Sequence, residues 1–296
     1  MRWEDVLVVQ LAINGIAIGC VYALVALGLV LIYKATEAVN FAQGDLLMLG
    51  SFFALTFISF AGLPFWIGLL LAIAGMAVVG VVVERAVLRP ILGQPQFAVI
   101  MVTIGVGFVL RSGASMIPGW GTSSQALPTP FSNQTFNLGG VVVAQEHAAI
   151  VGATVLLCLA LYVFFRHTRF GIAMQAASQN QLAAAYRGIP IKRVSAATWA
   201  IAAAVAALGG VLLAPIALVE ANMGFIMLKA FPAAVLGGFA SLPGAVIGGV
   251  VIGLIEVFSG RYISDTAKNL APYVVLLLVL VVRPEGLFAE PKKRRA

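Results

Sequence analysis

Charged residues are scarce in this chain. Only 10% of its 296 residues are Asp, Glu, Lys or Arg, whereas 61% are hydrophobic. This composition leaves too little polar surface to cover a water-soluble fold of that length, so an ordinary soluble domain is excluded. The sequence instead predicts an all-α polytopic membrane protein.

Cysteine, histidine and phosphate-binding signals are also sparse. Cys20 and Cys158 lie in separate apolar runs, so neither a disulfide nor a metal site is expected. His147 and His167 fall at the edges of apolar runs, without the serine or carboxylate partners of a hydrolase. No Gly-Lys pair occurs, so the phosphate loop of many ATPases is missing. We therefore expect no enzyme, no catalytic residue, no metal and no cofactor bound by this chain.

Apolar runs of bilayer length recur along the sequence. A hydrocarbon core of about 30 Å needs about 20 helical residues, and backbone amides in lipid must be hydrogen-bonded within their own segment. Membrane-crossing helices are predicted at residues 6–33, 44–62, 64–83, 97–117, 147–165, 194–219 and 269–283, with an irregular segment at 229–258. The prediction is a single domain over residues 1–296 with about eight or nine transmembrane helices.

The basic residues indicate how the bundle is oriented. If the chain starts outside, 13 of its 18 Lys and Arg residues fall on the inner side, where positive charge is expected. The basic clusters lack interleaved aromatic residues, so no nucleic-acid partner is expected. The prediction is a multi-pass protein of the cell inner membrane with a cytoplasmic C-terminus and a periplasmic N-terminus.

The segment at residues 166–193 is the longest inner stretch without a bilayer-length apolar run. It holds five basic residues and no acidic one. Two short helices are predicted in it, one over residues 172–177 and one opened by Asn180, whose side chain can accept hydrogen bonds from free backbone amides. Gly188 would end the second helix. Two interpretations stay open: a cytoplasmic docking platform, or a solvated loop whose charges only fix orientation.

The irregular segment at 229–258 contains helix-breaking residues in its middle. They are Gly237, Gly238, Pro243 and Gly244. We predict a short helix, a buried turn and a second helix from Ala245, because these residues do not fit one continuous helix. Non-helical backbone at membrane depth is stable only where protein or a water-filled cavity covers it. The break is therefore a candidate pathway or gate element.

Glycines and one glutamate in the apolar runs indicate how the helices pack against one another. Gly15 and Gly19 are spaced for close helix packing, as are the glycines of the second half of 229–258. Close packing is the simpler role for all of them. Glu256 is the acidic residue that lies clearly inside an apolar run, so it should face the bundle interior or the interface. It is a tentative candidate for a proton site.

Two connecting loops carry weaker signals. After the first span, Asn40 and Asp45 are candidate caps of the next helix, a role we favour over substrate contact. The outer segment at 112–146 forms a predicted periplasmic cap, with a hairpin at 136–143 around Gly139 and Gly140. Whether that cap receives an external partner or only connects two spans is left open.

Several motifs in fixed order resemble one transporter family over nearly the whole chain. The motifs are NGIAIGCVYALVALGLVLIY with NFAQGD (Asn40–Asp45), ERAVLRPIL (Glu84–Leu92), VTIGVGF (Val102–Phe108), FGIAMQAASQNQLAAAYRGI (Phe170–Ile189), KAFPAAVLGGFASLPGAVIGG (Lys229–Gly249) and VRPEGLF (Val282–Phe288). Together they resemble the H-type permease subunit of branched-chain amino-acid ABC importers. Any one of these motifs alone would be weak evidence for the family.

This resemblance implies partners and site residues. The implied partners are a second related permease, two cytoplasmic ATP-binding subunits that bind the ATP, and a periplasmic solute-binding protein. Carried over to this sequence, the ATPase-coupling residues are Ala176, Ala177, Asn180, Ala184, Gly188 and Ile189. The family motif in the first loop is Asn40, Phe41, Gly44 and Asp45. Gln175 and Gln181 stand where many other ABC importers have glutamate and glycine.

The implied mechanism is alternating access, in which ATP-driven closure of the partner subunits moves residues 170–189 and so tilts the bundle. Asn14, Thr103 and Asn222 are scattered polar groups available to line a mostly apolar pathway. Relatives of this kind also move urea, amides and aromatic acids, so branched-chain amino acids are the default solute. The competing classes are an ion-coupled secondary transporter, for which Glu256 is the candidate site, and a scaffold without transport.

Overall fold

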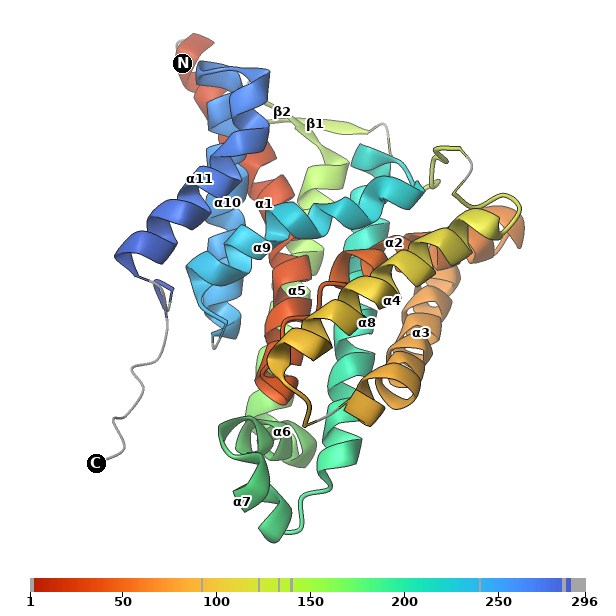
Figure 1. The fold of residues 1–296 in the computed structure, drawn as a ribbon. Coiled ribbons are helices and arrows are strands. Elements are labelled where there is room, and N and C mark those ends of the chain that lie inside the picture. The colour runs from red at the N-terminus through yellow and green to blue at the C-terminus, as the bar shows by residue number, and fades with distance from the viewer. Residues whose placement is uncertain are drawn as a thin grey trace.

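Helices make up nearly all of the structure. The computed structural model describes residues 3–91, 93–121, 123–132, 134–138, 141–239, 241–283 and 286–288 (Figure 1). Within these ranges, eight helical segments are long and apolar enough to cross a membrane. They span Asp5–Thr36, Gln43–Phe60, Phe65–Ile91, Gln96–Met116, Gln145–His167, Ile191–Ala217, Leu242–Tyr262 and Asp265–Val282. The predicted all-α polytopic fold is confirmed.

The elements follow one another closely along the chain. In the first half they are α1 (Trp3–Thr36), α2 (Gln43–Leu55) with the π-helical η1 (Thr56–Phe60), α3 (Phe65–Val83) with η2 (Glu84–Leu88) and η3 (Arg89–Ile91), and α4 (Gln96–Met116). The hairpin β1 (Thr135–Leu138) and β2 (Val141–Ala144) follows, then α5 (Gln145–His167), α6 (Arg169–Gln179) and α7 (Gln181–Tyr186). The last elements are α8 (Ile191–Ala217), η4 (Ala221–Phe225), α9 (Ile226–Gly237), α10 (Leu242–Tyr262) and α11 (Asp265–Val282).

Helix α1 forms the centre of the bundle, where its residues from Cys20 to Ile32 are buried. Its tightest contact is with α10, through glycines on both helices. A Cβ atom on Gly253 would lie 2.4 Å from the carbonyl oxygen of Gly15, and one on Gly19 would lie 2.6 Å from the Cα of Val250. The predicted close packing of these glycines is confirmed. Helices α4, α5 and α11 lie at the edges, where few of their residues are fully buried.

The predicted break in segment 229–258 is present, but it lies earlier than expected. Helix α9 ends at Gly237 and crosses in front of α1 (Figure 1). Gly238 then takes a φ of +83°, which favours glycine, and is buried. The prediction that Pro243 and Gly244 belong to the break, with helix from Ala245, is wrong. Helix α10 starts at Leu242, because Ser241 caps it by accepting a hydrogen bond from the Gly244 amide and proline fits the first turn.

The predicted hairpin is confirmed, with Phe136 opposite Val143 in an antiparallel pair; its turn at Gly139 and Gly140 lies outside the described residues. The segment before it is tied down at two places. Trp120 stacks on Phe52 and donates a 2.9 Å hydrogen bond from its indole N–H to Thr56, and Gln125 pairs with Val219 after α8. Residues 112–146 therefore pack onto the end of the bundle where α1 begins (Figure 1).

Candidate functional site

Helices α6 and α7 project from the end of the bundle opposite the start of α1 (Figure 1). Both are capped as short helices require. The Thr168 hydroxyl accepts a 2.9 Å hydrogen bond from the Gly171 amide, and the Asn180 side chain accepts one of 2.9 Å from the Ala183 amide. Gly188 ends α7 with a φ of +82°. The predicted cap at Asn180 and turn at Gly188 are confirmed.

The six proposed coupling residues divide between the inner and outer sides of these helices. Ala177 and Ala184 are buried against the bundle, Ala176 and Ile189 are half-buried, and Asn180 and Gly188 are exposed. Apolar side chains point outward beside them: Leu182 is 73% and Tyr186 91% exposed. Exposed apolar side chains that lie together are typical of protein–protein contact surfaces.

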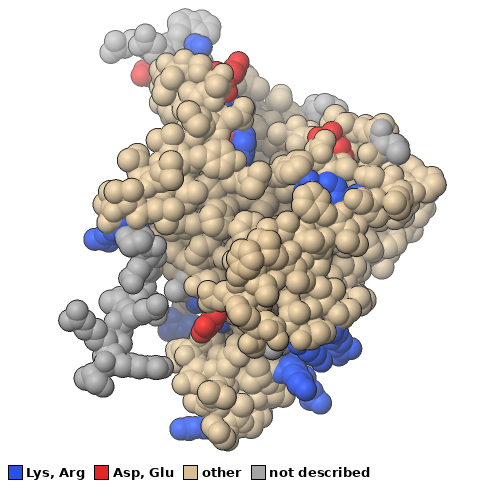
Figure 2. Space-filling view, in the orientation of Figure 1, with Lys and Arg blue, Asp and Glu red and all other residues tan. Residues whose placement is uncertain are grey.

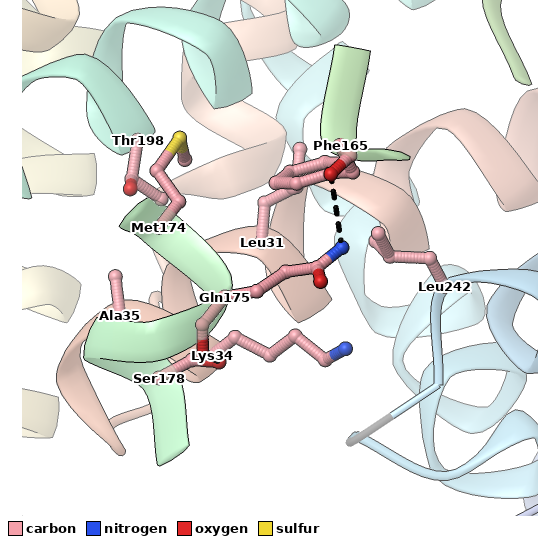
Figure 3. Close-up of a pocket in the computed structure, with 9 residues that line it drawn as sticks. All are labelled: Leu31, Lys34, Ala35, Phe165, Met174, Gln175, Ser178, Thr198 and Leu242. Atoms are coloured by element: carbon pink, nitrogen blue, oxygen red, sulfur yellow. Dashed lines mark hydrogen bonds between the residues drawn. The ribbon is translucent and has the colours of Figure 1, made fainter. Parts of the chain in front are cut away.

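A small pocket lies directly beneath α6. It has a volume of about 40 Å³ and is lined by residues of α1, α5, α6, α8 and α10 (Figure 3). In Figure 3 the Gln175 side chain extends across it and donates a 3.3 Å hydrogen bond to the Phe165 carbonyl of α5. Side chains from five helices therefore meet beneath α6.

The candidate gate and the coupling helices share a second, larger cavity. It has a volume of about 690 Å³ between α5 and the start of α10. Pro243 lines it together with Gln175 of α6, while Lys34 and Arg166 supply positive charge. The structure therefore brings Pro243 next to α6, although the two lie far apart in the sequence. Gly237 and Gly244 pack back to back at the same turn, where a Cβ on Gly244 would lie 2.1 Å from the Gly237 carbonyl.

Basic residues gather at this end of the molecule. Figure 2 shows Lys and Arg side chains in the lower part, over the ends of α3, α4 and α8. Arg89 is held there by a 2.8 Å ion pair with buried Glu84 and by the Lys192 carbonyl. The basic residues at 292–295 lie outside the described residues. The basic residues therefore gather at the end of the bundle that the sequence predicts to face the cytoplasm.

The family-motif loop is buried inside the bundle. Asn40 is 1% and Gln43 0% exposed, although the loop joins two helices. The Phe41 amide donates a hydrogen bond of 3.1 Å to the Thr103 hydroxyl of α4, and the Gln43 side chain donates one of 3.2 Å to the Ala202 carbonyl of α8. Thr103 is thereby occupied as a partner of this loop, so its expected place in a pathway lining is not supported.

Asp45 has a different role from the predicted one. Helix α2 begins at Gln43 without a side-chain cap, so the expected caps by Asn40 and Asp45 are wrong, although Asp45 does lie in the first turn of α2 as expected. Asn40 instead accepts a hydrogen bond from the Ala42 amide within the loop. The Asp45 carboxylate instead pairs at 2.7 Å with Arg111 of α4, whose guanidinium lies 3.9 Å above the Phe225 ring. The physical reason is that the loop is buried inside the bundle, so α2 starts beside α4. Gly44, the remaining motif residue, packs against the Gly224 carbonyl of η4.

A row of aromatic rings runs along α9, formed by Tyr33, Phe239, Phe231 and Phe41. Successive ring centroids are 4.9, 5.8 and 5.8 Å apart. All four side chains are half-buried. Each neighbouring pair is within the range of favourable aromatic contact, so the row joins the buried loop to the turn at Gly238.

Glu256 is the centre of a charged cluster at the other end of the bundle. It is 2% exposed and accepts hydrogen bonds from the Tyr22 hydroxyl and, at 2.8 Å, from the Lys229 ammonium. Lys229 also donates to Asn269 at 2.9 Å. A paired carboxylate of this kind does not need to bind a proton to stay buried, which weakens the proton-site hypothesis. Sequence reasoning missed Lys229, although a lysine inside an apolar run is a signal that a buried acidic partner exists.

The matching family model and the curated relatives agree on one family. The family described as "Branched-chain amino acid transport system / permease component" matches residues 11–282. The chain is similar to the high-affinity branched-chain amino acid transport system permease protein LivH of Escherichia coli K12, at 33% identity over 96% of each chain. It is similar to BraD of Pseudomonas aeruginosa, of the same description, at 31% identity over 96% of each chain. A solved structure, PsaBC of Streptococcus pneumoniae with a Fab, matches with a TM-score of 0.49 at 16% identity, covering 93% of this chain and 91% of the other.

Proposed function

The chain belongs to the family of branched-chain amino acid permease components, and from that premise we propose that it is the membrane-spanning subunit of an ATP-driven ABC importer. The proposed solutes are branched-chain amino acids, which the named relatives carry. The observation that carries the proposal is the capped helix pair α6–α7, whose outer side exposes Leu182 and Tyr186 while its inner side packs on the bundle. That is the arrangement needed to receive force from a separate subunit.

The proposed partners are other components of the same transporter. A second related permease would cover the exposed edge helices α4, α5 and α11, and two ATP-binding subunits would dock on residues 166–193. A periplasmic binding protein would approach the opposite end, where residues 112–146 form the proposed cap. In this proposal the chain is not itself an enzyme, because ATP is hydrolysed by the partner subunits.

The mechanism follows from the contacts of α6. Closure of the ATP-binding subunits moves α6–α7, and Gln175 transmits the movement to α5 while the shared cavity lets the start of α10 shift. The aromatic row beside α9 would then open or close the inner part of the pathway. Gly237, Gly238, Pro243 and Gly244 are the proposed hinge and gate residues, since two backbones contact each other there without side chains.

The proposed orientation places α6–α7 in the cytoplasm and the start of α1 in the periplasm. It is supported by the basic residues around α6–α7 and the lower ends of α3, α4 and α8 (Figure 2). Cysteine labelling tests it. Arg187→Cys, in a variant with Cys20→Ala and Cys158→Ala, should react with a membrane-impermeant maleimide only from the cytoplasmic side. Reaction in intact cells from the outside would overturn the assignment.

Uptake by the reconstituted complex tests the function. The permease with its ATP-binding subunits in proteoliposomes should accumulate radiolabelled leucine only when both ATP and the binding protein are present. Urea, an amide and an aromatic acid serve as alternative solutes in the same assay. Accumulation driven by a proton or sodium gradient without ATP would favour the secondary-transporter alternative and contradict the proposal.

A further inference from the structure

A cavity of about 330 Å³ surrounds the charged cluster at the end of the bundle away from α6–α7. We call it the charged cavity; α1, α8, η4, α9 and α10 line it. Helix α8, which starts beside α7, is 27 residues or about 40 Å long and reaches the cavity with its last turns. The surface is hollowed between the upper ends of α10 and α11 and the part that carries η4 (Figure 2).

The lining of the charged cavity combines one ammonium, two carboxylates and an apolar wall. Lys229, Glu256 and Glu220 supply the charges, and the apolar contacts come from side chains such as Ile18, Leu213 and Ile216. The volume lies within the range of small-molecule sites, about 300–1,000 Å³, which are mostly apolar with a few placed polar groups. A ligand that fits must carry charges of both signs and a short apolar part.

The contacts of the three charged groups decide which of them can bind a ligand. Both carboxylate oxygens of Glu256 are engaged, one by Lys229 and one by Tyr22, so Glu256 holds Lys229 in place. The Lys229 ammonium has three N–H donors, of which Glu256 and Asn269 accept two within the described part of the chain. Its side chain is 26% exposed, so the third donor is open to a carboxylate. Glu220 is half-buried and accepts one hydrogen bond from Ser124, which leaves acceptor capacity for an ammonium group.

We propose that the charged cavity is a transient binding site for the zwitterion of an α-amino acid, with Lys229 binding the carboxylate and Glu220 the ammonium group. This inference rests on the proposed transport function and adds the residues that recognise the solute. The apolar wall receives the aliphatic side chain. Glu256 and Tyr22 position Lys229 and do not contact the solute. Selectivity for amino acids over uncharged solutes would then exist in the permease itself, in addition to any in the binding protein.

Binding to the purified permease complex, without the binding protein, tests this site directly. Saturation-transfer NMR in nanodiscs with millimolar L-leucine should give a signal from the leucine methyl groups. Leucinamide lacks the carboxylate and 4-methylpentanoate lacks the ammonium group, so each should bind about tenfold or more weakly than leucine, since charge-assisted hydrogen bonds contribute that much.

Matched variants separate recognition from folding. Lys229→Met with Glu256→Gln removes both members of the ion pair together and leaves no unpaired buried charge. This double variant should bind leucine about tenfold more weakly than the wild type and should bind leucine and leucinamide equally. Lys229→Arg should keep the preference for leucine over leucinamide. Glu220→Gln should weaken leucine but not 4-methylpentanoate. Arg261→Met, exposed on α10 outside the cavity lining, is the control and should change nothing.

The outcomes distinguish this site from the proposed function. The wild-type importer could take up leucine with ATP while the neutral double variant keeps both leucine binding and the preference for leucine over leucinamide. In that case the charged cavity is not the amino-acid binding site, although the proposed transport function stands. If leucine binds here but the complete importer moves no branched-chain amino acid, the proposed function fails and the site is kept. A uniform loss for all three compounds in every variant would show a purely structural role and overturn the proposal.

Discussion

The glycine contact between α1 and α10 gives the sharpest prediction, because two effects of opposite sign compete there. Gly253→Ala adds one methyl group facing α1. The new Cβ would lie 2.4 Å from the Gly15 carbonyl oxygen and 2.4 Å from the Gly19 Cα, whereas ordinary contact begins at 3.4 Å. All these neighbours are backbone atoms, so no side chain can rotate away and the two helices must separate by about 1 Å at this contact.

The expected magnitude follows from overpacking and helix propensity. Overpacking a close contact costs about 1–3 kcal/mol, whereas replacing glycine by alanine inside a helix recovers up to about 1 kcal/mol. Gly253→Ala should therefore lower the free energy of unfolding by up to about 2 kcal/mol relative to the wild type, and by about 1–3 kcal/mol relative to a variant that has only the propensity gain. Gly152→Ala in α5 is the matched control. Apart from its own helix backbone, no atom of the described residues lies within 4 Å of its added Cβ, so only the propensity gain applies.

Unfolding by SDS titration in mixed micelles, followed by tryptophan fluorescence, measures both variants against the wild type. Gly253→Ala should unfold at lower SDS and Gly152→Ala at the same or higher SDS than the wild type. If Gly253→Ala is as stable as Gly152→Ala, the close approach of α1 and α10 is not present in the folded protein. The reasoning from these distances would then be refuted.

Three further predictions concern the other sites. Arg111→Met leaves the buried Asp45 carboxylate unpaired and should lower the free energy of unfolding by about 3–5 kcal/mol in the same assay. Asp45→Asn combined with Arg111→Gln should recover much of this loss. An equally large loss of stability in the double variant would contradict the pairing of Asp45 with Arg111. Gly188→Val should leave membrane insertion intact, since no described residue beyond its chain neighbours lies within 4 Å of an added Cβ, but it should reduce ATP-driven leucine uptake several-fold because valine strains a φ of +82°. Gly188→Asn should retain more uptake, and full uptake by the valine variant would argue against coupling through this turn. Asn180→Ala removes a helix cap that contributes about 1 kcal/mol. It should speed hydrogen exchange at the Ala183 amide several-fold and leave amide exchange in α6 unchanged. An unchanged exchange rate at Ala183 would show that the cap contributes nothing in solution.

Local features of the site were predictable from the sequence. The cap at Asn180, the left-handed turn at Gly188 and the β1–β2 hairpin depend on residues a few positions apart, so their patterns specify them directly. The break at 229–258 was also expected, yet its position was not. The start of α10 depends on a cap by Ser241, which competes with the breaking tendency of Pro243 and Gly244.

Pairings between distant residues were not predictable. Asp45 pairs with Arg111, 66 residues away, because the first loop folds into the bundle. The sequence places the two residues in different predicted spans, and no local pattern relates them. Glu256 was singled out from the sequence, whereas Lys229 was missed, and only the packing of α9 against α10 brings the two residues together. The same packing creates the charged cavity.

The sequence by itself determined that this chain is a membrane protein, where its helices run and which short segment leaves the bundle. These features follow from the cost of exposing charge and unpaired backbone to lipid, and that cost is set residue by residue. Only the tertiary structure decided which charges pair, how deep the family-motif loop lies and which residues line the charged cavity. Those depend on how closely glycine-lined helices approach each other, which is a property of whole helix surfaces.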